Sequence, residues 1–154
     1  MHLGQICSGS ELEEALFGCS SKSRNRHLPK STLDHSLKHV KSHQHVYGWN
    51  PRKPRTRAAK AMHTRVAKNL PHGRKELRLF VAIGSTLDAY YGVDAFFEYG
   101  GVIVTIDVTV SRHKDCPKAD FIVSLYDFTT NRIYQKLDLV AACLLERAQT
   151  KRVK

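Results

Sequence analysis

Two aspartates are spaced so that a β-hairpin would bring their side chains together. Asp94 and Asp107 flank a run of β-branched and aromatic residues that is interrupted by the pair Gly100–Gly101. A Gly-Gly pair is a strong signal for a two-residue hairpin turn, because glycine readily adopts positive φ. If the turn forms there, Tyr99 pairs with Val102, and Asp94 lies directly opposite Asp107.

The period of two along each strand places both carboxylates on one face of this hairpin. The other face is wholly apolar and is expected to lie in the core; it consists of Val93, Ala95, Phe97, Tyr99, Val102, Val104, Ile106 and Val108. Opposed carboxylates repel each other unless they share a proton or a divalent cation lies between them, and oxygen ligands suit Mg²⁺ or Mn²⁺. We therefore predict a metal site here. The alternatives are a solvated sheet end that screens the repulsion, or a hairpin slipped by one residue.

The residues around the hairpin predict a small mixed α/β core. Apolar periodicity predicts a helix, a strand and a helix at residues 74–83, 119–126 and 137–148. Glu76 lies on the polar side of the first helix, Asp88 in the loop before the hairpin, and Asp138 at the N-cap of the last helix. The expected order is helix, strand, strand, strand, helix.

Positive charge is concentrated ahead of this core. The 154 residues include 25 Lys and Arg against 14 Asp and Glu, and residues 20–75 hold 15 of these basic side chains but only one acid. Such a segment attracts polyanions, of which nucleic acid is the commonest. We expect a basic, partly irregular arm with short helices over residues 1–72, a core over 73–150 and a basic tail over 151–154. A solvated, flexible arm is the alternative.

The most basic part of this arm predicts a contact surface for nucleic acid. Residues 50–55 are punctuated by prolines and should be extended, whereas a helix is expected from Thr56 until Pro71 and Gly73 end it. The helix can equally pack on the core. The candidate nucleic-acid contacts are Arg52, Lys53, Arg55, Arg57, Lys60 and Arg65, with Arg112 beyond the hairpin.

Histidines recur every fourth residue at positions 35, 39 and 43, so a helix would stack them on one side. They could bind a transition metal, or form a partly protonated surface that attracts phosphate. The four cysteines form no CxxC pair, and neither a membrane span nor a secretory signal is apparent. We expect an intracellular protein, in the cytoplasm or associated with a nucleoid or virion, with free thiols.

Residues 76–126 resemble the PD-(D/E)XK nuclease superfamily, in which a helix acid precedes a strand pair that holds the metal ligands. Asp94 matches the first strand aspartate, and Asp107 matches the acid of the following acid-x-lysine motif. Glu76 matches the helix acid, and Asp88 competes for that role. The resemblance implies a restriction endonuclease-like fold and metal-dependent hydrolysis of phosphodiester bonds, with DNA as the expected substrate.

The resemblance also implies roles for individual residues. The metal would be held by Asp94, Asp107 and the backbone carbonyl of Val108. Thr109 takes the place of the motif's lysine, so Lys114 is the nearest substitute to face the attacking water or the phosphate, and Lys118 is a more distant one. Two alternatives remain, a catalytically silent nucleic-acid-binding module of the same fold and a basic structural or assembly protein. Whether the chain forms a homodimer is left open.

Overall fold

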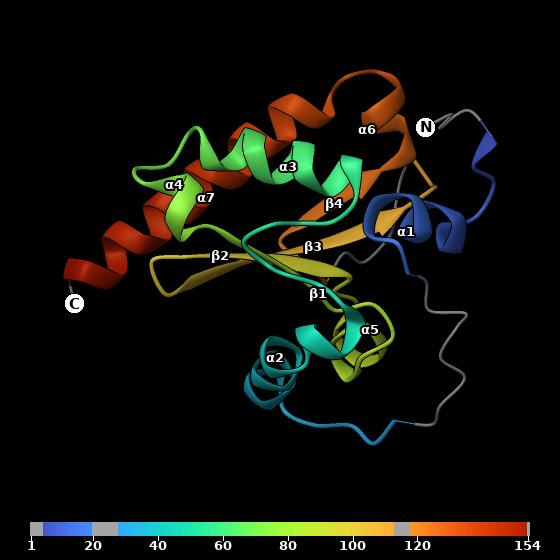
Figure 1. Ribbon diagram of the computed structural model, residues 1–154, viewed down its shortest axis with the longest axis horizontal. Helices are drawn as coiled ribbons and strands as arrows, with labels where there is room; N and C mark the ends of the chain where they lie inside the picture. Colours follow the sequence, from blue (N-terminus) through green and yellow to red (C-terminus); the bar gives the residue numbers. More distant parts are fainter. Residues whose placement is uncertain (1–4, 20–27, 113–117, 154) are drawn as a thin grey trace.

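A four-stranded mixed sheet forms the centre of the fold. The computed structural model describes residues 5–19, 28–112 and 118–153 (Figure 1). The strands lie in the order β1 (Arg78–Val81), β2 (Ala95–Tyr99), β3 (Val102–Thr109) and β4 (Phe121–Ser124). The pairs β1–β2 and β2–β3 are antiparallel, and β4 is parallel to β3.

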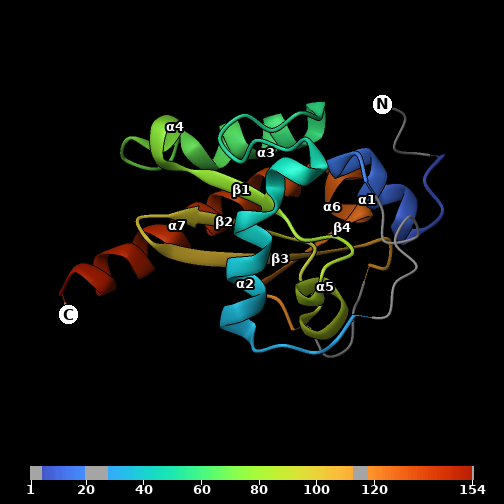
Figure 2. The ribbon, with the colours of Figure 1, turned by 60° about the horizontal axis from the view of Figure 1, so that its bottom comes forward.

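Helices cover both faces of this sheet. Along the described chain they are α1 (Gly9–Phe17), α2 (Leu33–Ser42), the 3₁₀ helix η3 (Gln44–Tyr47), α3 (Arg57–Ala67), α4 (Gly73–Glu76), α5 (Thr86–Tyr91), α6 (Leu125–Thr129) and α7 (Ile133–Val153). The larger core cluster joins one face of the sheet to α1, α3 and α7. A smaller cluster joins the other face to α2 and α5, which Figure 2 brings forward. The protein is therefore of the mixed α/β class, as predicted.

The hairpin has the predicted turn and register. Tyr99 pairs with Val102 and Ala95 with Ile106, so the apolar side chains between them enter the larger core cluster. Gly100 and Gly101 have φ values of 58° and 75°, which suit glycine and match the turn that joins right-twisted strands. The expected pairing is confirmed.

The predicted helix over residues 74–83 is wrong. The helix α4 ends at Glu76, and β1 starts at Arg78. Leu79 packs in the larger cluster and Phe80 in the smaller one, where its ring stacks on Phe96 at 4.9 Å. A strand buried on both faces reads as a continuous apolar run, which periodicity alone does not distinguish from a helix.

Two further boundaries differ from the expected ones. Asp88 lies in the short helix α5, which begins after the N-cap Ser85, and not in a loop. The last helix begins at Ile133, four residues earlier than expected, so Asp138 lies inside it and is no N-cap. Although α7 has 21 residues, neither it nor any other described helix combines the length and apolarity that crossing a membrane requires.

The basic segment belongs to the same core as the sheet. Leu16, Trp49 and Met62 lie in the larger core cluster, together with side chains of all four strands. The indole N–H of Trp49 donates to the carbonyl of Leu79 at 2.8 Å, and the N–H of Leu79 donates to the carbonyl of Pro51 at 2.9 Å. Side chains of the expected arm and of the expected core thus share one hydrophobic cluster. The segment that contains Gln44, Trp49 and Pro51 runs along the outer edge of β1, to whose backbone these residues are hydrogen bonded.

Candidate active site

The structure brings Asp94 and Asp107 together where the hairpin strands end. Asp94 directly precedes β2, Asp107 lies in β3, and their exposed fractions are 4% and 5%. Their carboxyl groups are hydrogen bonded to each other. Asp94 Oδ2 also accepts a hydrogen bond from the backbone N–H of Val108 at 2.8 Å. The predicted juxtaposition of the two acids is therefore present.

Burial and neighbouring acids keep Asp94 protonated at neutral pH. The pKa of Asp94 is raised to about 9, first by burial, then by the negative charge of Asp88, and then by the hydrogen bond and charge of Asp107. The N–H of Val108 acts in the opposite direction but does not offset these effects. A buried pair of carboxyl groups with one raised pKa is a typical feature of functional sites.

Asp88 is the third acid of this region. The helix α5 holds it between the N-cap Ser85, whose hydroxyl accepts from the N–H of Asp88, and Gly92, which ends the helix at a φ of 63°. Asp88 Oδ2 accepts from the N–H of Gly84 at 2.8 Å. Its charge reaches Asp94, so it is the better candidate for the accessory acid of the pair.

Glu76, the predicted helix acid, lies away from the acid pair. It ends α4 near the turn end of the hairpin, where burial and then the charge of Glu76 raise the pKa of Tyr99. Asp94 lies at the other end of β2, and five residues of strand span roughly 16 Å. The position of Glu76 follows from the replacement of the expected long helix by α4 and β1.

Two carboxyl groups are oxygen donors, which would suit Mg²⁺ or Mn²⁺ better than zinc. Among the described residues, no group of three or more His, Cys, Asp or Glu side chains is arranged to hold a metal ion. Mg²⁺ commonly uses only one or two protein carboxylates and completes its shell with water and substrate phosphate oxygens. In a regular strand the N–H and C=O of one residue point to the same side. The carbonyl of Val108 is thus on the Asp94 side of β3, because its N–H donates to Asp94.

Of the residues considered for the role of the motif's lysine, the structure describes Thr109 and Lys118. Lys114 lies outside the described residues. Thr109 occupies the expected lysine position, pairs with Ser124 across the sheet, and accepts a hydrogen bond from the N–H of Ser111 at 3.1 Å. The aliphatic chain of Lys118 lies beside Gly92, since a Cβ at Gly92 would be 3.6 Å from its Cβ and Cδ. Lys118 therefore reaches the loop that leads into Asp94.

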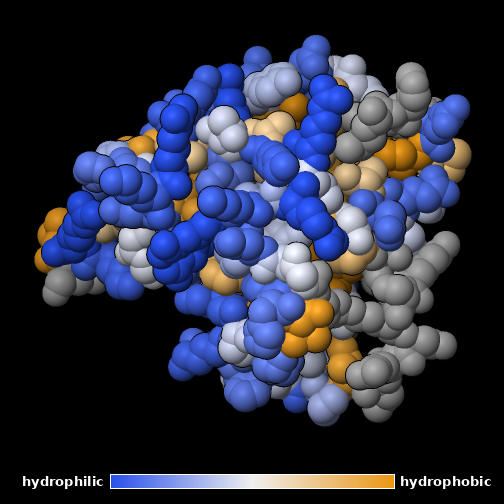
Figure 3. All heavy atoms as spheres, viewed as in Figure 1, coloured by the Kyte–Doolittle hydropathy of each residue, from blue (hydrophilic) through white to orange (hydrophobic). Residues whose placement is uncertain are grey.

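Four of the predicted nucleic-acid contacts line a single hollow of about 580 Å³ ahead of α3; they are Arg52, Lys53, Arg55 and Lys60. Hydrophilic side chains gather over α3 and the segment that leads into it (Figure 3). The guanidinium of Arg55 forms one wall of this hollow and lies close to Gly18 and Gly48. We name this feature the basic hollow.

The other three predicted contacts lie elsewhere. Arg57 borders a different, largely apolar hollow with Leu16 and Met62. Arg65 makes two hydrogen bonds of 2.8 Å to the carboxylate of Asp138, and so connects α3 to α7. Arg112 lies over the ring of Tyr126, with its Cζ 4.2 Å from the ring centroid. Arg65 is thus paired with a carboxylate 73 residues away in the sequence, which the sequence pattern did not predict.

The expected histidine stack is present in part, between His39 of α2 and His43, which caps that helix. The rings of His39 and His43 stack with centroids 3.9 Å apart. Burial lowers the pKa of His39, as do the charges of His43 and then His35. The described residues do not join these rings into a group that would hold a metal ion. The cluster therefore remains a stacked, exposed set of rings.

No protein-family model, curated protein or solved structure matches this chain significantly. The function is therefore argued from the geometry of the site.

Proposed function

We propose that the protein is a metal-dependent nuclease that hydrolyses phosphodiester bonds in nucleic acid, with DNA as the expected substrate. The observation that supports this best is the buried pair of Asp94 and Asp107, where burial, the charge of Asp88 and the contact with Asp107 raise the pKa of Asp94 to about 9. A divalent cation would compensate the charge that makes this arrangement unfavourable. In the hairpin register Ala95 pairs with Ile106, and Asp94 and Asp107 are the next residues along the two strands, as the resemblance to the PD-(D/E)XK motif leads us to expect.

The residues of the chain would divide the chemistry among them. A bound Mg²⁺ or Mn²⁺ supplies polarisation of the phosphate and a lower pKa for an attacking water. Asp94 and Asp107 would hold it through their carboxylates, which requires that Asp94 release its proton, and the carbonyl of Val108 lies on the same side. Lys114 or Lys118 would offset the negative charge that develops at the phosphate. Asp88 would accept a hydrogen bond from the attacking water and so help to orient it.

The basic hollow supports nucleic acid as the substrate. Arg52, Lys53, Arg55 and Lys60 line it together, and phosphate contacts of this type position a nucleic-acid backbone without reading its sequence. It lies at the outer edge of β1, whereas the acids lie at the ends of β2 and β3. We propose that the hollow holds a part of the substrate that flanks the cleaved bond.

Thr109 favours a second candidate, a module that binds nucleic acid without cutting it. It replaces the lysine that the motif would place beside the water, and its hydroxyl is already hydrogen bonded to Ser111. The two candidates share the basic hollow and differ only at the acid pair. Cleavage therefore separates them.

The test is incubation of the protein with plasmid, single-stranded DNA and RNA in Mg²⁺, Mn²⁺ or a chelator. We expect cleavage only with the metals, and a loss of more than about 100-fold in Asp94→Asn and Asp107→Asn, because each variant removes a metal ligand. Asp34→Asn is the matched control, since Asp34 is an exposed carboxylate of α2 paired with Lys38.

Two outcomes contradict the nuclease. If Asp94→Asn and Asp107→Asn cut as fast as the parent chain, the acid pair is not its metal site. If no substrate is cut in either metal but salt-sensitive binding persists, the binding module is correct. Calorimetry with Mn²⁺ extends the comparison, because a purely structural protein would bind no Mn²⁺ at these two aspartates.

A further inference from the structure

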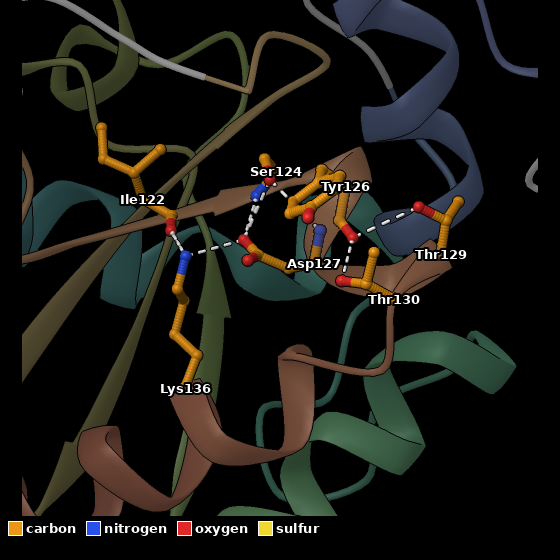
Figure 4. A network of polar contacts seen from close by, with 7 residues as sticks. All are labelled: Ile122, Ser124, Tyr126, Asp127, Thr129, Thr130 and Lys136. Atoms are coloured by element: carbon orange, nitrogen blue, oxygen red, sulfur yellow. Dashed lines mark hydrogen bonds and ion pairs between the residues drawn. The ribbon is translucent and has the colours of Figure 1, made fainter.

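A second cationic hollow lies beside β4, outside the acid pair and the basic hollow. Its volume is about 340 Å³, and it is found where β4 ends and α6 begins. The side chains that give it its chemistry are Arg112, Ser124, Tyr126, Asp127, Arg132 and Lys136. Figure 4 shows four of them, with Lys136 of α7 pointing toward Asp127 and the backbone of β4. We name this feature the β4 hollow.

Tyr126 holds two of the cations. The Cζ atoms of Arg112 and Arg132 lie 4.2 Å and 5.4 Å from the centroid of its ring. A guanidinium stacked on an aromatic ring keeps its N–H donors, which lie in the guanidinium plane, available at the edge. In the described part of the chain neither arginine forms an ion pair with a carboxylate. Arg132 directly precedes α7, whose first N–H groups add partial positive charge there.

Lys136 provides the third cation, and it is firmly positioned. Its Nζ donates to the carbonyl of Ile122 at 2.6 Å and to Asp127 Oδ2 at 2.7 Å, which leaves its third N–H for a ligand. Burial acts to raise the pKa of Asp127, but the hydrogen bonds from Lys136 and Ser124 lower it below its ordinary value. Asp127 is therefore charged at neutral pH. The three cations exceed it, so the hollow is positive overall.

The β4 hollow lies next to the acid pair across the sheet. Ile122, whose carbonyl accepts from Lys136, is the direct partner of Asp107 in the β3–β4 register. Neighbouring strands are about 4.8 Å apart, so the ammonium of Lys136 lies within roughly 10 Å of the backbone of Asp107. Phosphates repeat about every 3.4 Å of rise along one strand of a duplex, so a separation of roughly 10 Å spans about three nucleotides.

We propose that the β4 hollow binds a phosphate of the strand that the acid pair acts on, an inference that rests on the proposed function. Planar guanidinium groups and an ammonium around one cavity match the oxygens of a phosphate, which they bind through charge-assisted hydrogen bonds. The volume of the hollow, about 340 Å³, is within the range of small-ligand sites and is large enough for a nucleotide. The phosphate is either a terminal monoester or an internal diester.

The experiment measures binding in the presence of a chelator, so that cleavage does not contribute. The probes are two fluorescent single-stranded oligonucleotides of one sequence, with and without a 5′-phosphate, and the readout is anisotropy at several salt concentrations. We expect Arg132→Ala to weaken binding about tenfold, because one charged hydrogen-bonding partner is lost. The slope of log affinity against log salt should decrease by the amount expected for about one lost phosphate contact. Arg132→Lys should restore part of the affinity. Arg152→Ala is the matched control, because it removes the same charge at the other end of α7.

Each outcome has a distinct meaning. A loss confined to the phosphorylated probe assigns the hollow to a terminal phosphate, and an equal loss on both probes assigns it to an internal one. If Arg132→Ala and Arg152→Ala weaken both probes equally, the inference is overturned. Asp107→Asn should retain the Arg132-dependent binding. The proposed nuclease activity can thus fail while the phosphate site stands, and the reverse also holds.

Discussion

Asp94 loses most of its contact with water in the folded chain and receives one backbone donor, the N–H of Val108, in return. Its nearest charged neighbours are acids, so folding raises its pKa to about 9 from an ordinary value of 3.8. Between these two values the folded chain binds a proton that the unfolded chain releases. The stability of the protein should therefore decrease as the pH rises from about 4 to about 9.

Asp94→Asn should stabilise the metal-free protein near pH 8. The amide keeps an oxygen that accepts from Val108, gains a donor for Asp107, and needs no proton. We expect the parent chain to lose up to about 1.4 kcal/mol of unfolding free energy per pH unit in this window from Asp94, and the variant to lack this slope. Urea unfolding at pH 5.5, 7 and 8.5 in a chelator measures it.

The control for this prediction is Asp34→Asn, which removes an exposed carboxylate and should leave the slope unchanged. Mg²⁺ should raise the unfolding free energy of the parent chain more at pH 8.5 than at pH 5.5, because it competes with the proton on Asp94. An unfolding free energy of the parent that rises between pH 5.5 and 8.5, or an equal slope in Asp94→Asn, would contradict the raised pKa.

At the scale of the elements, the hairpin was predictable and β1 was not, for a physical reason. The alternation on both sides of Gly100–Gly101 allows only one register that keeps Asp107 out of the core. Leu79 and Phe80 are both buried, on opposite faces of the sheet, so the apolar run of β1 has no period that separates a strand from a helix. Asp88 was considered as a site acid but was expected in a loop for a related reason, since a helix as short as α5 has too few residues to show a period.

The turn between α3 and α4 depends on a glycine for close approach. A Cβ at Gly73, the first residue of α4, would lie 2.0 Å from the carbonyl oxygen of Ala67, the last residue of α3. Backbone atoms cannot move aside as a flexible side chain can. We therefore expect Gly73→Ala to destabilise the protein by about 2–3 kcal/mol, as measured by urea unfolding.

Gly9→Ala is the matched control for this substitution. Gly9 is also the first residue of a helix, α1, but a Cβ there meets no atom within 4 Å. This variant should be neutral or stabilised by up to about 1 kcal/mol, because alanine restricts the unfolded chain. A destabilisation of the same size in both variants would show that helix propensity, and not the contact with Ala67, sets the effect of Gly73→Ala.

At the scale of the whole molecule, the sequence located the positive charge but not its division among surfaces. Arg52 and Arg65 both belong to the basic segment, yet one lines the basic hollow and the other is paired with Asp138. The β4 hollow was not predicted beyond Arg112, because Tyr126, Arg132 and Lys136 are brought together by the end of β4 and the start of α7. Pairings of this kind depend on tertiary distances, which charge counts along the chain do not contain.

This division predicts different effects for two kinds of charge removal. The double variant Arg52→Ala, Lys53→Ala should weaken binding to duplex DNA and reduce the slope of log affinity against log salt by about 1.8, as expected for two lost phosphate contacts. Arg65→Ala removes a charge of the same segment but breaks the ion pair with Asp138. It should leave the salt slope near that of the parent and lower the melting temperature instead.

Anisotropy titrations from 50 to 250 mM NaCl in a chelator, together with thermal unfolding of the same variants, test both expectations at once. If all basic residues acted only through a diffuse positive field, each removed charge would reduce the slope equally, whether or not it had an acidic partner. The paired guanidinium of Arg65 is neutralised within the fold and releases no counterion from DNA. An equal reduction of slope per charge in Arg65→Ala and in the double variant would therefore exclude a defined basic hollow and leave only the net charge of the segment as the origin of binding.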